Sequence, residues 1–409
     1  MKRRAFVQSL AAIPALASTQ GSSVAPRSDT APLRIGPHII VVGAGAFGGW
    51  TALHLLRRGA RVTLIDQWGP GNARASSGGE TRVIRHAYTT RIYVDFVARS
   101  LEIWRESSHR WNRPLYHETG VLFMGPDDSF IGPAHQQMEA AGVEHEVIET
   151  DEIARRFPQI NPEGMALATW EPRAGFLLAR RGCEAVLDAF REEGGTYREA
   201  QARPGDISGG EVQNVVLSDG TTLAADMYVF ACGPWLGRVF PDVIGNLVRP
   251  TRQEVFYFGT AAGDTRFSEE HFPVWADMGS PVWYGIPDNA NRGFKVADDT
   301  IGPETDPTTM ERIPTAAGLE AARKYMEFRF PALKGAPLLD ARVCQYEETP
   351  DKHLIVDRHP RAENLWIAGG GSGHGYKFGP ALGEHVVERV LDGKPVEPLF
   401  RLSRFAGRH

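Results

Sequence analysis

The feature that most constrains the fold of this sequence is a G-x-G-x-x-G turn at 43–48, which lies between two short apolar runs. The run at 38–42 is rich in β-branched residues, which predicts a buried parallel strand. Residues 49–58 have helical apolar spacing, and 62–65 predict a second strand that ends at Asp66. A strand, a glycine turn, a helix, a strand and an acid in this order predict a dinucleotide-binding unit, whereas a glycine turn alone would also suit an unrelated α/β protein.

Each glycine of this turn has a physical role in binding a pyrophosphate. Gly43 permits the tight turn, Gly45 lets the backbone approach the phosphates, and Gly48 lets the helix pack closely on the strand. The helix N-terminus adds free N–H groups and the positive end of its dipole, and Asp66 can accept hydrogen bonds from ribose hydroxyls. The contacts predicted for the dinucleotide in this unit are Gly43, Gly45, Ala46, Phe47, Gly48 and Asp66. This fingerprint does not distinguish FAD from NAD.

The composition argues against a nucleic-acid-binding protein, a disulfide-rich protein and a zinc protein. The chain has 409 residues, of which 42% are hydrophobic and 23% charged, as in a globular protein of one large or two intermediate domains. A formal net charge of -5 gives no basic surface for nucleic acid. The three cysteines, Cys183, Cys232 and Cys344, cannot form a disulfide framework and lack zinc-site spacing, so we expect no metal site.

The segment 1–20 is typical of an export signal. Arg3 and Arg4 precede an apolar stretch that ends in Ala-Leu-Ala, which resembles the twin-arginine type of signal. That route carries folded proteins, as a protein that binds its cofactor before export requires. Residues 21–35 read as a flexible linker, and no later run approaches the ~20 apolar residues that span a bilayer. We expect a periplasmic or extracellular protein without a membrane anchor after cleavage; a frayed basic N-terminus is the alternative.

Further tracts of the sequence carry a family resemblance. They are ARASSGGETRVIRHAY at 73–88, YVFACGPW at 228–235, CQY at 344–346, HLIVD at 353–357 and AGGGSGHGYKF at 368–378. In this order they resemble segments of the monomeric sarcosine oxidases and N-methyltryptophan oxidases, which belong to the D-amino-acid-oxidase superfamily of FAD-dependent oxidoreductases. The resemblance extends from about His38 to Leu391.

The resemblance implies an α/β fold with a Rossmann-type FAD-binding domain and a second, antiparallel-sheet substrate domain. The expected FAD-binding domain is discontinuous, at 36–85, 150–240 and 340–395, and the substrate domain takes 86–149 and 241–339. Alternating strand character at 254–258 and 282–286 agrees with such a sheet, and 91–110 predicts an amphipathic helix used in packing.

The resemblance also assigns cofactor contacts. A cysteine at the position of Cys344 forms a thioether to the flavin 8α-carbon in the sarcosine oxidases, which implies covalent FAD; a buried free cysteine is the alternative. The other residues implied to contact FAD are Ser76, Ser77, Arg82, Gly233, Trp235, Gly373, His374, Gly375 and Lys377.

Five residues are implied to act on the substrate or on O₂. Lys377 places a cation near the flavin that stabilises the anion formed from O₂, unless it is a solvent-facing loop lysine. Arg85 suits a substrate carboxylate, because a guanidinium binds it bidentately, although a surface ion pair is the alternative. Tyr284 and Tyr346 line the implied pocket or are core tyrosines. Asp299 stands where an ungapped alignment puts a histidine of the sarcosine oxidases.

Gly78 and Asp299 depart from the sarcosine oxidase pattern, so the substrate need not be sarcosine; Asp299 would suit a second cationic group on a larger amine. The expected reaction is oxidation of the C–N bond of a small secondary amine or N-substituted amino acid by a monomeric enzyme. The imine is then hydrolysed, and O₂ reoxidises the flavin to give hydrogen peroxide. The alternatives are a dehydrogenase that passes electrons to a quinone or a protein, and a non-catalytic FAD-binding export or assembly factor.

Overall fold

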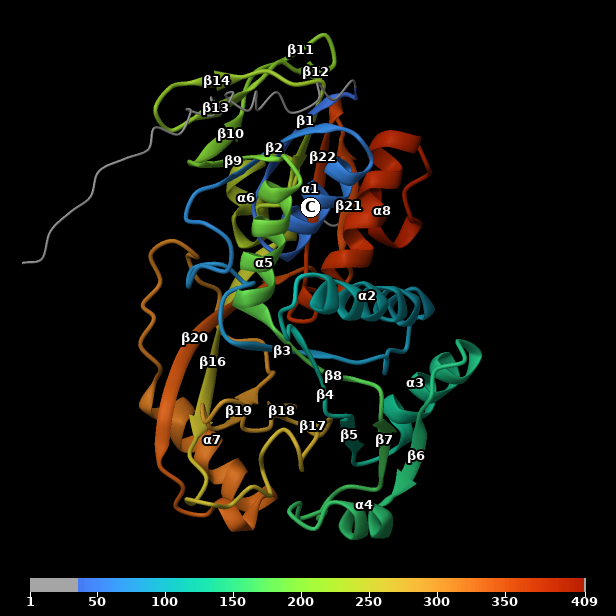
Figure 1. The fold of residues 1–409 in the computed structure, drawn as a ribbon, viewed down its shortest axis with the longest axis vertical. Helices are drawn as coiled ribbons and strands as arrows, with labels where there is room; N and C mark the ends of the chain where they lie inside the picture. The colour runs from blue at the N-terminus through green and yellow to red at the C-terminus, as the bar shows by residue number, and fades with distance from the viewer. Residues whose placement is uncertain (1–35, 408–409) are drawn as a thin grey trace, which may run out of the picture. The chain divides into compact units, whose positions relative to one another are not determined.

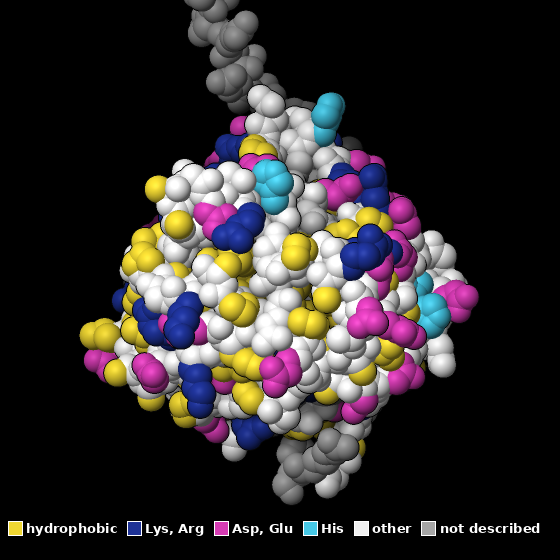
Figure 2. All heavy atoms as spheres, turned by 90° about the horizontal axis from the view of Figure 1, so that it is seen from below, with side chains coloured by type: hydrophobic (Ala, Val, Ile, Leu, Met, Phe, Trp, Pro, Cys, Tyr) yellow, Lys and Arg dark blue, Asp and Glu magenta, His cyan; other side chains and the backbone are white. Residues whose placement is uncertain are grey.

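The computed structural model describes residues 36–407, so the predicted export signal and linker lie outside the described residues. Two large sheets organise this part of the chain, one drawn in the upper and one in the lower half of Figure 1. None of the helices between residues 36 and 407 is long and apolar enough to cross a membrane. Figure 2 shows acidic and basic side chains interspersed with apolar ones on the face seen from below.

The first sheet has the order β21-β22-β15-β1-β2-β9. Its strands are β1 (His38–Val42), β2 (Arg61–Asp66), β9 (Thr196–Glu199), β15 (Met227–Phe230), β21 (Ile355–His359) and β22 (Ala362–Gly369). All neighbours are parallel except β21 and β22. The central strand β1 is almost completely buried because helices cover the sheet, which explains its continuous apolar run. The predicted α/β class is confirmed.

Helices α1 (Ala46–Arg57), α5 (Ala179–Glu192) and α8 (Gly379–Asp392) pack in one core with β1 and β2. The α1 helix begins at Ala46, earlier than the predicted Gly49, so it takes in the end of the glycine turn. Gly48 makes this close start possible, since a Cβ atom there would lie 1.9 Å from the carbonyl oxygen of Gly43. The dipole of α1 therefore begins directly at the carboxyl end of β1.

The second sheet has the order β20-β16-β19-β18-β17-β5-β7-β6 and is antiparallel except for the pair β5 and β17. Its strands are β5 (Val121–Gly125), β6 (Glu146–Glu149), β7 (Leu167–Glu171), β16 (Arg249–Phe258), β17 (Val274–Asp277), β18 (Trp283–Ile286), β19 (Phe294–Asp298) and β20 (Leu338–Glu348). Helix α7 (Ala316–Arg329) shares its core. The predicted boundary at 150 assigns β7 to the nucleotide-binding segments, whereas its hydrogen bonds place it in this sheet, because strand character alone does not identify a partner strand.

The described part of the chain also contains a small sheet of order β3-β8-β4 and further helices and strands. They are β3 (Thr81–Ile84), β4 (Tyr116–Glu118), β8 (Gly175–Leu178), α2 (Arg91–Arg110), α3 (Asp128–Ala140), α4 (Thr150–Arg156), α6 (Leu236–Val239), β10 (Ala202–Pro204), β11 (Ile207–Ser208), β12 (Glu211–Val212), β13 (Val215–Leu217) and β14 (Thr222–Leu223). The α2 helix has the bounds predicted for it and packs on α8.

Candidate active site

A cavity of about 800 Å³ opens at the carboxyl ends of β1, β2 and β15, within the size range of ligand pockets of roughly 300–1,000 Å³. It receives residues from the glycine turn, the turn after β15, the end of β20 and the loop after β22. The predicted site residues that line it are Gly43, Gly45, Ala46, Phe47, Asp66, Ser76, Ser77, Arg82, Gly233, Trp235, Tyr346, Gly373 and Gly375. Segments distant in the sequence thus form one elongated site.

The end of this cavity beside α1 fits the pyrophosphate and ribose of a dinucleotide. The helix has no side-chain cap bond at Gly45, and the backbone N–H of Ala46 meets the Ser77 hydroxyl at 3.0 Å. The Asp66 carboxylate accepts the N–H groups of Ala44 at 2.7 Å and Trp68 at 2.9 Å, which fixes its orientation at the cavity. An uncapped helix N-terminus beside a fixed carboxylate provides donors for phosphate and acceptors for ribose.

Arg82 links this cavity to Cys344. One of its nitrogens lies 3.5 Å from the Cys344 sulfur and donates to the carbonyl oxygens of Ser76 at 2.8 Å and Gly78 at 2.6 Å. The predicted flavin-proximal arginine and the predicted attachment cysteine therefore lie side by side, although they come from β3 and β20. Gly78 has no room for a side chain, since a Cβ atom there would lie 2.4 Å from the carbonyl oxygen of Asn72.

Lys377 is buried, with 5% of its surface exposed, and does not line the dinucleotide cavity. Its ammonium donates to the Tyr88 phenol at 2.9 Å and to the His374 carbonyl oxygen at 2.7 Å. Burial, followed by the positive charge of Arg85, holds the pKa of Lys377 well below its usual range. The alternative of a solvent-facing loop lysine is therefore wrong.

His374 adjoins Lys377, and its ring lies outside the lining of the cavity. Burial and the charge of Lys377 lower the pKa of His374 to about 3, so the ring is neutral. Its Nε2 atom lies 3.0 Å from the Lys352 carbonyl oxygen, which only accepts, so Nε2 carries the proton. Nδ1 then accepts from the Tyr88 phenol at 3.3 Å.

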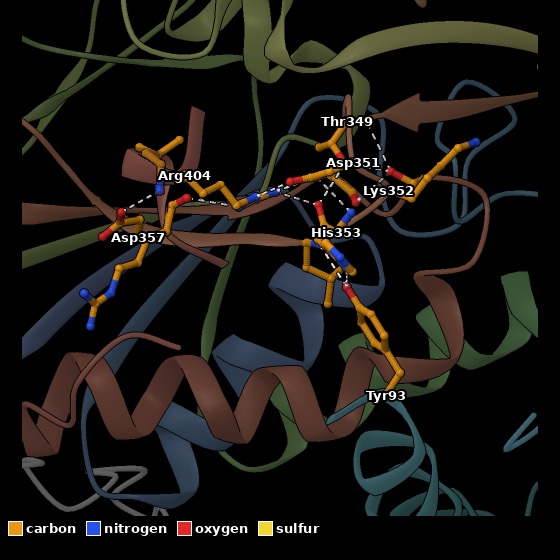
Figure 3. Close-up of polar contacts among 12 residues, drawn as sticks. Tyr93, Thr349, Asp351, Lys352, His353, Asp357 and Arg404 are labelled. Carbon is orange, nitrogen blue, oxygen red and sulfur yellow. Dashed lines mark hydrogen bonds and ion pairs between the residues drawn. The ribbon is translucent and has the colours of Figure 1, made fainter. Parts of the chain in front are cut away.

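The turn that supplies the Lys352 carbonyl is held from several sides (Figure 3). The Thr349 hydroxyl donates to the His353 carbonyl oxygen at 2.8 Å, and the His353 ring meets the Tyr93 phenol at 3.0 Å. Arg404 donates to the Asp351 carboxylate at 2.9 Å and to the same His353 carbonyl at 2.9 Å. The turn after β20 is therefore held in place, and through Lys352 it contacts the loop that carries His374 and Lys377.

Lys295, on β19, is a second buried lysine, which the sequence reasoning missed. Only 2% of its surface is exposed, and its ammonium lies 3.4 Å from the Thr81 carbonyl oxygen and 5.1 Å from the centre of the Tyr284 ring. Burial, followed by the charge of Arg82, lowers the pKa of Lys295 to about 7. The sequence offered no signal for it, because a lysine within an apolar strand is expected to face solvent.

Of the predicted substrate residues, Tyr346 and Asp299 are in direct contact, and Arg85 lies against Tyr88. The Tyr346 phenol donates to the Asp299 carboxylate at 2.6 Å, and burial raises the pKa of Tyr284 and of Tyr346 beyond the usual range. The guanidinium of Arg85 stacks 3.9 Å from the centre of the Tyr88 ring and donates to the Ala87 carbonyl. Tyr346 thus lines the cavity and contacts Asp299, while a role of Tyr284 and Tyr346 toward a substrate stays a prediction.

A buried carboxylate also missed from the sequence fixes the strand that carries Arg85. Glu171 is 1% exposed and accepts the backbone N–H groups of His86 at 2.6 Å and Ala87 at 2.9 Å, together with the His86 ring at 3.0 Å. Because these N–H groups follow Arg85 directly, Glu171 holds the backbone beside Arg85 in place.

Known proteins resemble this chain in sequence and in fold. The family model described as DAO, FAD dependent oxidoreductase, matches residues 38–389. Monomeric sarcosine oxidase of Bacillus sp. (strain NS-129) is 29% identical over 381 residues, which are 90% of this chain and 97% of that protein. N-methyl-L-tryptophan oxidase of Yersinia pestis (strain Pestoides F) is 29% identical over 378 residues, 90% of this chain and 99% of that protein. The structure of L-proline dehydrogenase from P. horikoshii has the same fold, with a TM-score of 0.78 at 23% identity, and covers 90% of this chain and 98% of that one.

Proposed function

This chain belongs to the DAO family of FAD-dependent oxidoreductases, and on that premise we propose that it oxidises the C–N bond of a small secondary amine or N-substituted amino acid. The observation that carries the proposal is a set of four basic side chains near the cavity that lie close enough to influence one another's pKa. They are Arg82, Arg85, Lys295 and Lys377, and each lysine feels the charges of the arginine nearest to it and of Asp299.

Positive charges that surround a bound amine disfavour its ammonium form, so they lower its pKa and favour the free amine. The free amine is the form whose nitrogen lone pair assists loss of a hydride equivalent from the neighbouring carbon. The same charges attract a substrate carboxylate, which Arg85 is oriented to bind through its planar guanidinium. The positive charges thus favour both binding of the substrate carboxylate and loss of the ammonium proton. The reaction therefore needs no side chain that acts as a general base.

FAD, when bound, accepts the hydride equivalent and passes two electrons to an acceptor. Gly43, Gly45 and the N-terminus of α1 would hold its pyrophosphate, and Asp66 its adenosine ribose. Cys344 is the residue proposed to attach it covalently. The imine product hydrolyses in water and needs no further group from the protein.

We propose O₂ as the acceptor, with hydrogen peroxide as product, because a buried cation stabilises the anion formed when O₂ takes up an electron. Lys377 and Lys295 both offer such a cation. A dehydrogenase that uses a quinone or a protein carrier is the second candidate, and it is favoured by the structural likeness to L-proline dehydrogenase, a dehydrogenase by name.

The test mixes the purified protein anaerobically with N-methyl amino acids, cyclic imino acids and glycated amines, and follows flavin absorbance. Bleaching by at least one of these amines is expected, and the absence of bleaching by all of them would contradict amine oxidation. Admission of O₂ should then restore the colour with one hydrogen peroxide per turnover. Recovery with a quinone but not with O₂ would establish the dehydrogenase instead.

A further inference from the structure

Glu347 is a buried carboxyl group at the cavity to which neither the sequence nor the proposed reaction gives a role. It lies near the end of β20, lines the cavity and has 7% of its surface exposed. Its Oε2 atom has no hydrogen-bond partner among residues 36–407. A buried acceptor without a partner costs free energy, on the order of 1–3 kcal/mol, so this oxygen requires an explanation.

Three glycines leave the space that the carboxyl group occupies. A Cβ atom on Gly371 would lie 2.8 Å from Oε1, and Cβ atoms on Gly233 and Gly369 would lie 3.5 and 3.7 Å from Oε2. Gly233 belongs to the turn after β15, and Gly369 and Gly371 to the end of β22 and its loop. The carboxyl group is therefore held between the two glycine-rich turns that face the cavity.

The protein satisfies this group only in part. The backbone N–H groups of Gly370 and Gly371 favour the ionised form, but burial outweighs them and raises the pKa of Glu347 to about 7. The N–H of Ser372 donates to the Glu347 carbonyl oxygen at 3.2 Å, which ties the loop to β20. The backbone at Glu347 is thus tied to the loop, and the Oε2 atom is available to a ligand.

We propose that Glu347 accepts hydrogen bonds from the hydroxyl groups of the ribityl chain of FAD, an inference that rests on FAD as the cofactor of the proposed function. The turn of Gly233 adjoins the pyrophosphate end of the cavity, because β15 pairs with β1. Cys344, the proposed attachment point of the flavin ring, lies on the same strand as Glu347.

A group between these two points faces the segment of FAD that joins the pyrophosphate to the ring, and that segment is a polyol. Phosphate oxygens only accept hydrogen bonds and would repel the ionised form of Glu347, whereas hydroxyls can donate to the free oxygen of the carboxyl group in either form. The adenosine ribose already has Asp66. The ribityl hydroxyls are therefore the donors that match both the position and the chemistry of Glu347.

The test uses Cys344→Ala protein, in which FAD is held without a covalent bond, and adds Glu347→Gln to it. Release of FAD after dilution is followed by the recovery of free-flavin fluorescence, with ADP in excess to prevent rebinding. We expect Glu347→Gln to speed release by about tenfold or more, on the scale of a lost hydrogen bond to a charged group. The concentration of ADP that prevents rebinding should be the same with and without Glu347→Gln, because the adenosine contacts are unchanged.

Glu348→Gln is the matched control, because Glu348 is the next residue of β20, is 1% exposed and pairs with Lys352 at 2.8 Å. It should release FAD at the rate of its parent. If Glu347→Gln does not fold, Glu347→Asp, which withdraws the carboxylate by one methylene, serves in its place with the same expectation.

Equal release rates in the Glu347 and Glu348 variants would overturn the inference, and weaker ADP binding in the Glu347 variant would move the contact to the adenosine half. These outcomes differ from a failure of FAD as the cofactor, in which case the Cys344→Ala parent itself would carry no FAD. They also differ from a failure of amine oxidation, in which case FAD would be bound but no amine would bleach it.

Discussion

The ammonium nitrogen of Lys377 lies 2.9 Å from the phenol oxygen of Tyr88, and that phenol in turn lies 3.3 Å from Nδ1 of His374. In its protonated form Lys377 has three protons and donates two of them, to Tyr88 and to the His374 carbonyl oxygen. One proton therefore stays available for a ligand. The neutral His374 ring keeps the phenol hydrogen directed away from Lys377, so the lysine remains the donor in this pair.

The roles of Lys377 and Lys295 can be separated by Lys→Met variants, which keep length and apolar packing but remove the charge. Replacement of the lysine beside the site of O₂ reduction should slow reoxidation of the flavin by about two orders of magnitude or more, on the scale of one lost preorganised electrostatic group. Flavin reduction by the amine should suffer less. Stopped-flow measurement of the two half-reactions gives both rates.

The pH dependence of reoxidation is a second signature of the same lysine. The charged form is the active one, so the rate should fall as the pH rises through the pKa, which for Lys295 is about 7. The matching Lys→Met variant should lose this dependence. Unchanged reoxidation in both variants would exclude either lysine as the oxygen site and would favour the dehydrogenase.

Cys344 is expected to hold FAD covalently, since its sulfur faces Arg82 at the cavity. Formation of the thioether removes the thiol hydrogen and one hydrogen of the 8α-methyl group, and the two electrons pass through the flavin to O₂. Acid-denatured protein should retain the yellow colour on a filter, and Cys344→Ala should release it. Colour found wholly in the filtrate of the unmodified protein would show non-covalent binding.

Asp299 is expected to select substrates by their charge. Its carboxylate accepts from Tyr346 and keeps contact with solvent, so it can meet a cationic group on a larger amine. Asp299→Asn should lower kcat/KM about tenfold for amines with a second positive group, on the scale of one charged hydrogen bond. Amines without that group should be affected little, and an equal loss for both classes would point to a structural role.

Stability should fall on the acid side because buried histidines remain neutral in the folded chain. Burial lowers the pKa of His385 to about 3 and of His54 to about 4, against 6.5 for the free side chain. As the pH falls below 6.5, the unfolded chain takes up protons that the folded chain does not, so the free energy of unfolding decreases. The Tm should drop between pH 7 and 5, by less per kcal/mol than the about 2–4 °C of a chain of 150–250 residues, because the entropy of unfolding grows with chain length.

His385→Phe provides the control for this slope, because the ring already packs on Phe96 and Phe400. The variant should show a flatter Tm profile between pH 7 and 5. A profile as steep as that of the parent would assign the acid sensitivity to other groups.

Export through the twin-arginine route is proposed from Arg3 and Arg4. Replacement of both by lysine should keep folded, flavin-loaded precursor in the cytoplasm, as seen by cell fractionation and flavin fluorescence. The secreted protein should begin near Ser18 by N-terminal sequencing. Continued export of the double variant would contradict this route.

The nucleotide-binding unit could be predicted from the sequence because its signals are local. The strand, the glycines and Asp66 follow one another within one continuous segment, and each has a backbone reason to be there. Such features require no knowledge of a distant partner. Cys344 and Tyr346, which share a face of one strand, were assigned by the family resemblance, and their roles stay predictions.

Lys295 and Glu347 could not be predicted in this way. In an alternating strand a lysine between Phe294 and Val296 is expected to face solvent. It is buried only because β3, far away in the sequence, covers that face with Thr81. Glu347 is likewise buried by two turns that follow other strands, β15 and β22.

The β20 strand pairs with β16 in continuous register from Arg249↔Glu348 to Tyr257↔Asp340, and within it Cys344, Tyr346 and Glu347 lie within four consecutive positions. A shift by one residue would exchange the two faces and move all three residues to the wrong side at once. Insertions or deletions in this strand should therefore be the changes that descendants of this protein tolerate least. A directed-evolution library that aims to widen the substrate range should instead vary the segment after β19 that carries Asp299. A substitution there alters the contact with Tyr346 and leaves the strand register intact.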